Sequence, residues 1–269
     1  MLLSELIKKI KSKQTLQNLD DSIIEQKIIT YLKKNSLHLQ DLNKKQLTNL
    51  LKTIRKDLHE QYGVFQLDLK KRKFYFEKLK NNPNSLDFHN KILSTHKSTY
   101  ERLEIYPVLY KKLFSLTCKP NSILDISSGL NPFSFPYMNL KNVKYISTEL
   151  TLEDCKFIQS YFNIKKINGK VLQLDLFSFK NFPKADITFL FKTFHSLEKN
   201  SFKIAEKILK NLNSKFIIVS FPIKTISDKK MNFPYYPGFE RLLKRLNFKY
   251  KKLLLKNELF FIINRNIYI

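Results

Sequence analysis

The feature that most constrains this chain is an alternation of short β-forming runs with helical segments after Pro120. Such alternation is typical of a parallel sheet, because parallel neighbours need a long crossover connection, which is usually a helix. The β-forming runs cover positions 123–126, 143–147, 171–174, 187–191 and 216–221. A chain of 269 residues can bury the core of such a sheet, either as one large domain or as two unequal ones.

Two more strand-like runs follow at 248–255 and 259–263, with only a short polar break at 256–258 between them. A connection this short forces the two strands to pair antiparallel. Five parallel strands followed by a reversed hairpin are the strand inventory of Rossmann-like class I methyltransferases. We therefore predict an α/β fold with a mostly parallel seven-stranded sheet and an antiparallel terminal hairpin, and not a dinucleotide-binding dehydrogenase.

The region before the sheet has a helical pattern. From Leu2 to about Leu69 apolar residues recur at three- and four-residue spacing, which predicts amphipathic helices. The candidate helix ends are Asp20 or Asp21 and Asp41 as N-caps, and Gly63 as a terminator.

A loop is expected at 81–85, followed by helical sequence to about Leu116. We therefore expect an all-α domain at 1–94 in front of a cofactor-binding domain at 95–269.

The charge balance is strongly basic. Lys and Arg number 49 against 23 Asp and Glu, a formal net charge of +26. A field of this sign attracts polyanions such as nucleic acid. The excess is almost all Lys, beside abundant Asn, Ile and Phe and no Trp, so a compositional bias that gives a solvated basic surface is the alternative.

The cysteine usage points to a reducing compartment. Cys118 and Cys155 are too few and too isolated for a disulfide framework or a thiolate metal site. No apolar run reaches the roughly 18 residues that a membrane span needs. The segment Met1–Lys13 alternates apolar residues with lysine and does not have the apolar stretch of a signal peptide. We expect a cytoplasmic protein with no metal and no membrane association.

The first strand of the predicted sheet ends in a turn of small residues. The segment 123–132 reads ILDISSGLNP. In open α/β sheets the ligand binds beyond the carboxyl ends of the strands, and the first strand-to-helix turn comes closest to it. The chain has only four glycines, so Gly129 in this turn, behind Ser127, is informative. An ordinary turn after a strand is the alternative, and the absence of G-x-G-x-x-G argues against a dinucleotide.

Acidic residues stand at the carboxyl ends of three consecutive predicted strands. They are Asp125, Glu149 and Asp175. A carboxylate such as Glu149 can accept two hydrogen bonds from a ribose diol, while Asp175 can accept from an adenine amino group that Leu176 covers. Each acid alone could be a surface carboxylate. The three together predict a nucleoside-containing cofactor, and with the strand inventory they favour S-adenosylmethionine.

The missing motifs narrow the methyl acceptor. Methylation of pyrimidine carbon-5 needs a cysteine nucleophile, and neither cysteine is expected at the mouth of the sheet. Enzymes that methylate exocyclic amines carry an Asn-Pro-Pro-aromatic turn after the fourth strand, where this chain has KTFH at 192–195. Guanine N7 presents an in-plane lone pair and needs no general base. Alignment and charge stabilisation suffice for transfer to it.

Four ordered segments carry a resemblance that covers nearly the whole chain. The chain resembles the aminoglycoside-resistance 16S rRNA methyltransferases, which methylate N7 of guanine 1405 in the decoding region of the small ribosomal subunit. The segments are HKSTYERL at 96–103, LDISSGLNP at 124–132, FKTFHSLE at 191–198, and VSFP at 219–222 with NEL at 257–259.

The resemblance implies roles for individual residues. Around S-adenosylmethionine it places Arg102, Ser98 and Thr99 near the methionine carboxylate, Glu149 on the ribose, Asp175 and Leu176 on the adenine, and Asp125, Ser127, Gly129 and Phe191 in the lining. Phe65 resembles an aromatic side chain of the helical domain that reaches the cofactor.

On the target side, Lys192 and Glu198 match residues that position the base, although Glu198 could equally be an acid that stabilises a helix N-terminus. The N-terminal helices resemble a ribosome-docking domain whose lysines contact 16S rRNA. We expect a monomer.

The chain departs from the family pattern in three places. Ser127 and Ser128 replace a small residue and a cysteine, and His195 replaces a proline. The segment 223–231 is shorter than the family's glycine-rich loop and offers Lys224 and Lys229 for RNA binding where arginines are usual. Lysine retains the charge without the bidentate geometry. A methyltransferase for another RNA guanine, or a non-catalytic RNA-binding protein on this scaffold, therefore remains an alternative.

Overall fold

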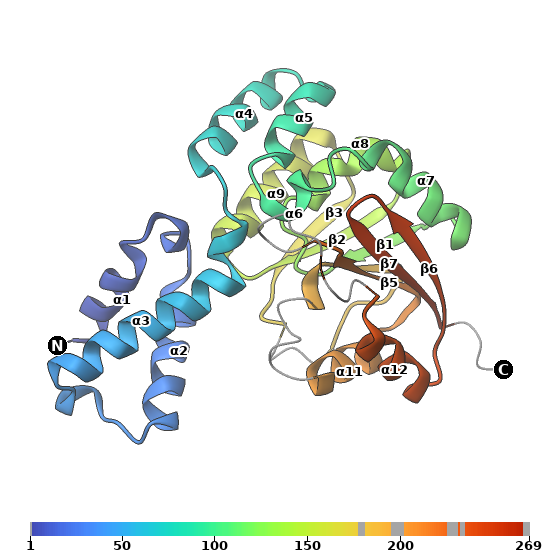
Figure 1. The fold of residues 1–269 in the computed structure, drawn as a ribbon. Coiled ribbons are helices and arrows are strands. Elements are labelled where there is room, and N and C mark those ends of the chain that lie inside the picture. Colours follow the sequence, from blue (N-terminus) through green and yellow to red (C-terminus); the bar gives the residue numbers. More distant parts are fainter. Residues whose placement is uncertain (1, 177–180, 195–201, 225–230, 232–234, 266–269) are drawn as a thin grey trace. The chain divides into compact units, whose positions relative to one another are not determined.

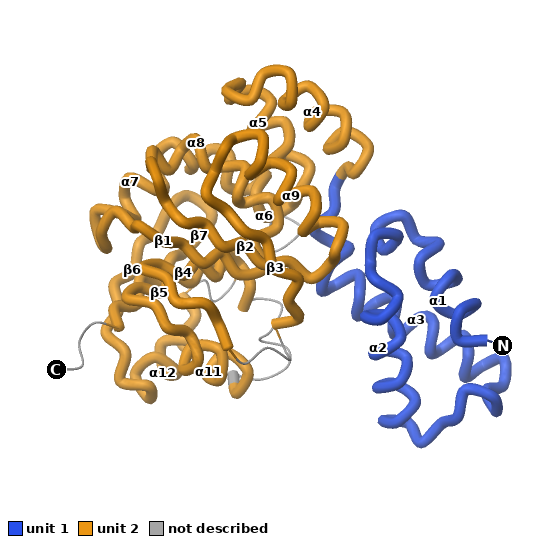
Figure 2. The backbone as a smooth tube through the Cα atoms, turned by 180° about the vertical axis from the view of Figure 1, so that it is seen from behind, with its two compact units in different colours: residues 1–67 blue, residues 68–269 orange. Residues whose placement is uncertain are grey.

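The protein is described by a computed structural model over residues 2–176, 181–194, 202–224, 231 and 235–265. The chain divides into two compact units, Met1–Leu67 and Asp68–Ile269, coloured separately in Figure 2. The compact units therefore divide after Leu67, earlier than the expected domain boundary at 94. Helical sequence between these two positions packs with the sheet-containing unit.

The first unit consists of three helices and short 3-10 turns. The helices are α1 (Leu3–Lys11), α2 (Asp21–Lys34) and α3 (Lys44–Gln61). Their apolar faces form a core in which Leu6, Ile28 and Ile54 are almost fully buried, as the three- and four-residue spacing predicts. Asp20 occupies the N-cap position of α2, but the N-cap of α3 is Asn43 and not Asp41. The side chain of Asn43 accepts a hydrogen bond from the backbone of Gln46, and the Gln46 side chain accepts one in return, forming a capping box.

The second unit begins with helices that precede the sheet. They are α4 (Leu69–Asn81), α5 (Leu86–Leu93), α6 (Lys97–Tyr100) and α7 (Tyr106–Leu116). The predicted loop separates α4 from α5, where the Ser85 side chain caps α5 by accepting a hydrogen bond from the backbone N–H of Phe88.

The sheet has seven strands in the order β3-β2-β1-β4-β5-β7-β6. Their bounds are β1 Ser122–Asp125, β2 Lys144–Glu149, β3 Gly169–Gln173, β4 Ala185–Phe191, β5 Ser214–Pro222, β6 Lys249–Leu255 and β7 Glu258–Asn264. Pairing is parallel from β3 to β5, and β7 runs antiparallel to both β5 and β6. The predicted class I fold with a reversed terminal hairpin is confirmed.

Helices cover both faces of this sheet. Neighbouring residues of β1 contribute to different apolar clusters, Ile123 to one and Leu124 to the other, because side chains alternate along a strand. Figure 1 shows α7, α8 (Phe135–Met138) and α9 (Leu152–Lys165) on one side of the sheet, with α11 (Phe202–Asn211) and α12 (Pro237–Arg245) on the other. The parallel strands are thus sandwiched, which leaves their carboxyl ends as the open edge for a ligand.

Among the described helices, none combines the length and the apolar character that crossing a bilayer requires.

Candidate functional site

The three predicted acids lie at the same edge of the sheet. Asp125 is the last residue of β1, Glu149 is the last residue of β2, and Asp175 follows the end of β3 by two positions. These three strands are parallel neighbours, so their carboxyl ends adjoin. Asp125 and Glu149 are buried, and Asp175 is half-buried beside the buried Leu176.

Within the described residues, one carboxylate oxygen of Asp125 accepts hydrogen bonds and the other accepts none. Its Oδ2 accepts hydrogen bonds from Asn131 Nδ2 at 2.9 Å and from the Tyr145 hydroxyl at 2.7 Å. Its Oδ1 is buried and has no hydrogen-bond partner within the described part of the chain. Burial raises the pKa of Asp125 to about 6. A buried carboxylate oxygen without a donor is the kind of group that a bound cation or N–H donor stabilises.

The turn after β1 requires glycine at position 129. Gly129 has a φ of +56°, and a Cβ there would lie 2.6 Å from Cε1 of His96. Both the left-handed backbone and the close approach of the imidazole disfavour a side chain. Ser127, also left-handed with a φ of +49°, is exposed at the same turn. The predicted small-residue turn is therefore tightly constrained, and its backbone faces the strand ends.

Glu149 is tied to this turn. Its Oε1 accepts a hydrogen bond from the backbone N–H of Gly129, and the Ser128 hydroxyl lies 3.4 Å from the same oxygen. Burial and the neighbouring Asp154 raise the pKa of Glu149 to about 8. Asp154 is in turn 3.5 Å from the buried guanidinium of Arg72, on α4. The backbone of the turn after β1 thus positions Glu149 in the ligand-free protein.

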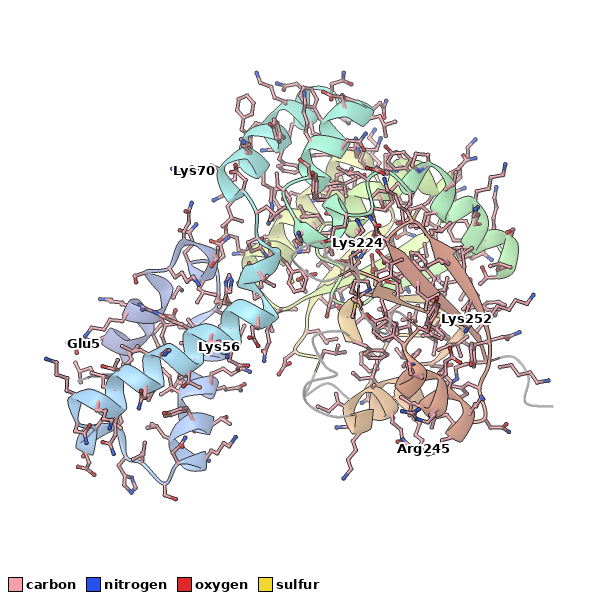
Figure 3. The ribbon with its side chains drawn as sticks, viewed as in Figure 1. Glu5, Lys56, Lys70, Lys224, Arg245 and Lys252 are labelled. Carbon is pink, nitrogen blue, oxygen red and sulfur yellow. The ribbon has the colours of Figure 1, made fainter. Side chains whose placement is uncertain are left out.

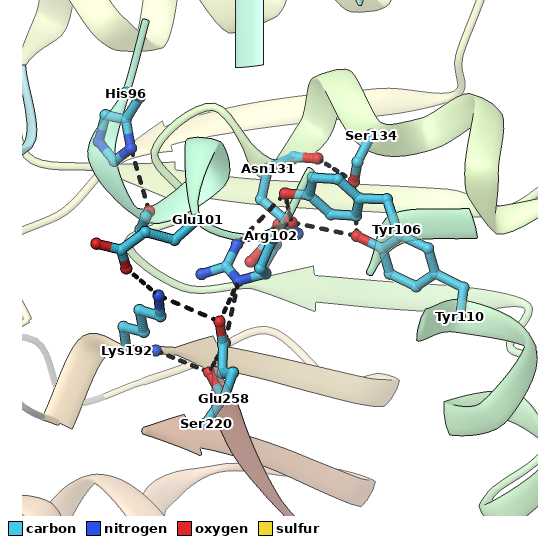
Figure 4. A network of polar contacts seen from close by, with 12 residues as sticks. His96, Glu101, Arg102, Tyr106, Tyr110, Asn131, Ser134, Lys192, Ser220 and Glu258 are labelled. Carbon is cyan, nitrogen blue, oxygen red and sulfur yellow. Dashed lines mark hydrogen bonds and ion pairs between the residues drawn. The ribbon is translucent and has the colours of Figure 1, made fainter. Parts of the chain in front are cut away.

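A polar network lies beside these acids, and Figure 4 shows it. Arg102 donates from Nε to both oxygens of Glu258 at 3.0 Å, and its Nη1 lies 3.4 Å from the Tyr106 hydroxyl and from Asn131 Oδ1. The guanidinium stacks over the Phe191 ring, with its carbon 5.0 Å from the centroid. Arg102 is therefore a fully buried cation with a buried counterion.

Lys192 joins the same network from the end of β4. Its Nζ lies 3.3 Å from Glu258 Oε2 and forms an ion pair with Glu101. Its backbone is left-handed, with a φ of +59°, and its N–H donates to the Ser220 hydroxyl at 3.0 Å. A lysine in this backbone conformation is strained, and such strain is concentrated at functional sites.

The remaining predicted residues have mixed placements. The Thr99 hydroxyl donates to the carbonyl of Leu93, and the Ser98 hydroxyl hydrogen-bonds to Nδ1 of His96 at 3.1 Å, so both are engaged in local structure. Lys224 is half-buried after β5. Phe65 belongs to the first unit, in a 3-10 turn after α3.

Three predicted or noted positions, His195, Glu198 and Lys229, lie outside the described residues.

Several residues of the network were not assigned from sequence. Glu258 was noted only as part of a motif, and Asn131, Tyr106 and Tyr145 were not singled out. The tyrosines at 106 and 110 are four residues apart on one face of α7, and both hydroxyls lie within 3.2 Å of Asn131 Oδ1. The available signal was the four-residue spacing of the two tyrosines, which places both hydroxyls on one face of the helix.

The architecture and the acids at the strand ends define a class I S-adenosylmethionine-dependent methyltransferase. Similar solved structures show the same fold: the 16S rRNA methylase RmtB has a TM-score of 0.78 at 22% identity, with 99% of each chain covered. The 16S rRNA methyltransferase RmtF, solved with S-adenosyl-L-homocysteine, has a TM-score of 0.80 at 18% identity, with 98% of each chain covered.

The family itself is shown by sequence. The profile of the ribosomal RNA methyltransferase (FmrO) family matches residues 46–262. A 16S rRNA (guanine(1405)-N(7))-methyltransferase from Proteus mirabilis is 33% identical over 239 residues, covering 80% of this chain and 84% of that protein. The chain belongs to the FmrO family of ribosomal RNA methyltransferases, as its sequence motifs indicated.

Proposed function

We propose that this protein transfers a methyl group from S-adenosylmethionine to N7 of a guanine in the decoding region of 16S rRNA. The observation that carries the proposal is the family match across 46–262, which spans the strand ends bearing Asp125, Glu149 and Asp175. The RNA target comes from the relatives, of which the Proteus mirabilis protein is named for guanine 1405.

The residues at the strand ends fit this cofactor. The open Oδ1 of Asp125 suits the ammonium group of the methionine tail, and Arg102 suits its carboxylate. Glu149 would accept hydrogen bonds from the ribose, and Asp175 with Leu176 would hold the adenine. Glycine at position 129 lets the turn approach His96 more closely than a residue with a Cβ could. Ser98, Thr99, Ser127 and Phe191 would shape the same site, and the resemblance to the family implies a cofactor-binding role for Phe65 as well.

Methyl transfer to N7 requires little from the protein beyond alignment of the methyl donor with the purine. S-adenosylmethionine supplies a methyl group on a positively charged sulfur. The N7 lone pair would form the new bond to carbon while the C–S electrons pass to sulfur, so no proton would have to be removed. The site must hold the purine in line with the methyl group and tolerate the charge that develops on the ring. Lys192 and Glu198 are the proposed positioning groups.

RNA docking would use the first unit and the basic surface of the second. A cavity of about 570 Å³ in the first unit is lined by four cationic side chains together with Thr48, Leu51 and His59; the cations are Lys13, Lys52, Arg55 and Lys56. The Arg55 Nε has no hydrogen-bond partner among the described residues. We call this cavity the basic groove, and its charge fits the phosphate oxygens of an RNA backbone. Figure 3 shows basic side chains, such as Lys56, Lys70 and Lys252, on both units. Lys224 and Lys229 would contact RNA near the target.

The proposed setting follows from this target. The substrate would be the assembled small ribosomal subunit in the cytoplasm, the protein would act as a monomer, and the modification would confer aminoglycoside resistance.

Expression in a susceptible bacterium tests the proposal. Borohydride-aniline cleavage and primer extension of 16S rRNA should reveal one new N7-methylated guanine, together with aminoglycoside resistance. Asp175→Ala is the matched control, and it should abolish both signals while the protein remains folded. If 16S rRNA is unmodified and mass spectrometry of nuclease digests finds a methylated guanine in another RNA, the protein is a methyltransferase with a different target. If no guanine is methylated and calorimetry detects no S-adenosylmethionine binding, the protein is a non-catalytic RNA-binding protein.

A further inference from the structure

Glu258 is a buried carboxylate at an unusual place, the first position of β7. It lies opposite Pro222 of β5 and Leu255 of β6, and only 2% of its side chain is exposed. Burial favours its neutral form, but the charges of Arg102 and Lys192 outweigh burial and hold the pKa of Glu258 below its ordinary value. Glu258 is therefore ionised, and its charge is balanced by two cations.

The contacts of Glu258 fix the orientation of Arg102. Both carboxylate oxygens accept from Nε, while Nη1 is directed at Asn131 and Tyr106 and Phe191 covers one face of the guanidinium. Within the described part of the chain, Nη2 is the guanidinium nitrogen left without a hydrogen bond. A guanidinium held on three sides presents one defined edge to an incoming anion.

Glu258 is itself held in place. The Ser220 hydroxyl donates to Oε1, and Lys192 Nζ lies 3.3 Å from Oε2. Asn131 extends the network in the other direction, because its Nδ2 donates to Asp125 Oδ2. A continuous chain of polar contacts therefore runs from Asp125 through Asn131, Arg102 and Glu258 to Lys192, as Figure 4 shows in part.

We infer that Glu258 is a positioning residue that orients Arg102 to bind the carboxylate of the methionine tail. The inference rests on the proposed function, since it assigns a role within the proposed cofactor site. Without the Glu258 carboxylate, Nε loses its charged two-oxygen acceptor, and the free edge of the guanidinium is no longer directed. Affinity for the carboxylate-bearing part of the ligand should fall, whereas affinity for the nucleoside part should not.

Two ligands separate these effects. S-adenosylhomocysteine carries the amino-acid tail, whereas 5′-methylthioadenosine has the same nucleoside and sulfur without the tail. Calorimetry with wild-type protein and Glu258→Gln should show about 10- to 100-fold weaker binding of S-adenosylhomocysteine by the variant, the range expected for loss of a charge-assisted contact. Binding of methylthioadenosine should change by less than about twofold.

Further variants complete the test. Glu258→Asp retains the charge and should recover part of the affinity. Glu104→Gln removes an exposed carboxylate that pairs with Lys256 on the surface, and should bind both ligands as the wild type does. In the Arg102→Met background, Glu258→Gln should have little further effect on S-adenosylhomocysteine, because it acts through Arg102.

The outcomes are distinguishable. If the wild type binds S-adenosylhomocysteine and Glu258→Gln weakens both ligands equally, or neither, the positioning role is overturned and the proposed function stands. If the wild type binds neither ligand, the proposed function fails first. A thermal unfolding midpoint of the Gln variant well above the assay temperature would exclude loss of fold as the cause of a selective effect.

Discussion

The Nε of Arg102 donates hydrogen bonds to both carboxylate oxygens of Glu258 at 3.0 Å, across 156 residues of sequence. Burial alone would lower the pKa of Arg102, but the Glu258 charge and the Tyr106 hydroxyl outweigh it, so that the pKa is raised. The pair joins the segment between α6 and α7 to the terminal hairpin. Both partners are charged and buried, so removal of Glu258 leaves the charge of Arg102 buried without its counterion.

Removal of one partner should therefore destabilise the protein. Glu258→Ala leaves Arg102 buried without its counterion, and we expect the free energy of unfolding in urea to fall by about 3–5 kcal/mol. Glu77→Ala is the control, because Glu77 pairs with Lys80 on the exposed face of α4, and its loss should change stability by less than about 1 kcal/mol. Similar values for the two variants would contradict the buried pair.

The turn after β1 predicts opposite effects for two substitutions. Gly129→Ala adds a Cβ beside His96 at a φ of +56°, and should lower stability by at least about 1–2 kcal/mol. Ser127→Gly relieves a left-handed non-glycine residue at a φ of +49° and should be neutral or stabilising by up to about 1 kcal/mol. Thermal unfolding of both variants measures the difference. A stable Gly129→Ala protein would mean that His96 does not approach the turn.

The raised pKa of Glu149 predicts a pH-dependent ligand affinity. In the proposed complex, ribose hydroxyls would donate to the ionised carboxylate of Glu149. In the ligand-free protein, burial and Asp154 raise the pKa of Glu149 to about 8. Affinity for S-adenosylhomocysteine should therefore increase between pH 6.5 and 8 by no more than about tenfold per pH unit, and then level off. Glu149→Gln should bind weakly with a flat profile. An affinity of the wild type that is constant over this range would count against the assignment.

The same pKa predicts a trend in the stability of the ligand-free protein. The folded-state pKa of Glu149 is about 8, above the ordinary value of 4.5, so the folded state retains a proton that the unfolded chain releases. This contribution is fully present below pH 4.5 and is lost as the pH rises through 8. Urea unfolding at pH 5 to 9 should show the wild type losing stability relative to Glu149→Gln. A difference that grows with pH in the opposite direction would refute the buried neutral carboxyl.

Lys192 should affect transfer more than cofactor binding. Lys192→Met retains the aliphatic stem and removes the charge beside Glu101 and Glu258. We expect S-adenosylhomocysteine affinity within about threefold of wild type and single-turnover methylation of 30S subunits reduced by about 100-fold or more. Lys184→Met, at the exposed position just before the same strand, should behave as wild type. Equal losses in binding and transfer would place Lys192 on the cofactor side.

The basic groove of the first unit predicts the salt dependence of RNA binding. Lys52 and Lys56 line this cavity, and each phosphate contact should contribute nearly one unit to the slope of log affinity against log salt. Lys52→Ala and Lys56→Ala should each reduce that slope by about one and weaken binding at low salt. Unchanged slopes in both variants would mean that the groove does not contact RNA. A flat salt dependence in the wild type would mean that the +26 charge reflects compositional bias.

Much of the fold could be predicted from the local pattern of apolar and polar residues, because the periodicity of strands and helices appears within short stretches of sequence. All seven predicted strands are present, and the short break at 256–258 correctly required an antiparallel hairpin. The end of the first compact unit at Leu67 could not be predicted from the sequence. Helical sequence continues on both sides of Leu67, and only packing shows which helices belong to which unit.

The site was predictable where its residues share a segment or follow a strand. Asp125, Gly129 and Glu149 do so, and the structure brings them together. The partnership of Arg102 with Glu258 was not predictable from spacing, since it depends on β7 inserting between β5 and β6. Nor does sequence alone show that Asn131 links Asp125 to Arg102, because an asparagine before a proline reads as a turn residue.

The placement of β7 between β5 and β6 also bears on the order in which the molecule can form. Residues emerge from a translating ribosome in sequence order, so β1 to β5, Arg102 and Lys192 exist before the strand that carries their shared counterion. Until β7 is added, β5 pairs with β4 alone and its other edge has no partner strand. The two cations, Arg102 and Lys192, then have no Glu258 between them. A nascent chain therefore cannot assemble this network early, and its completion coincides with closure of the sheet.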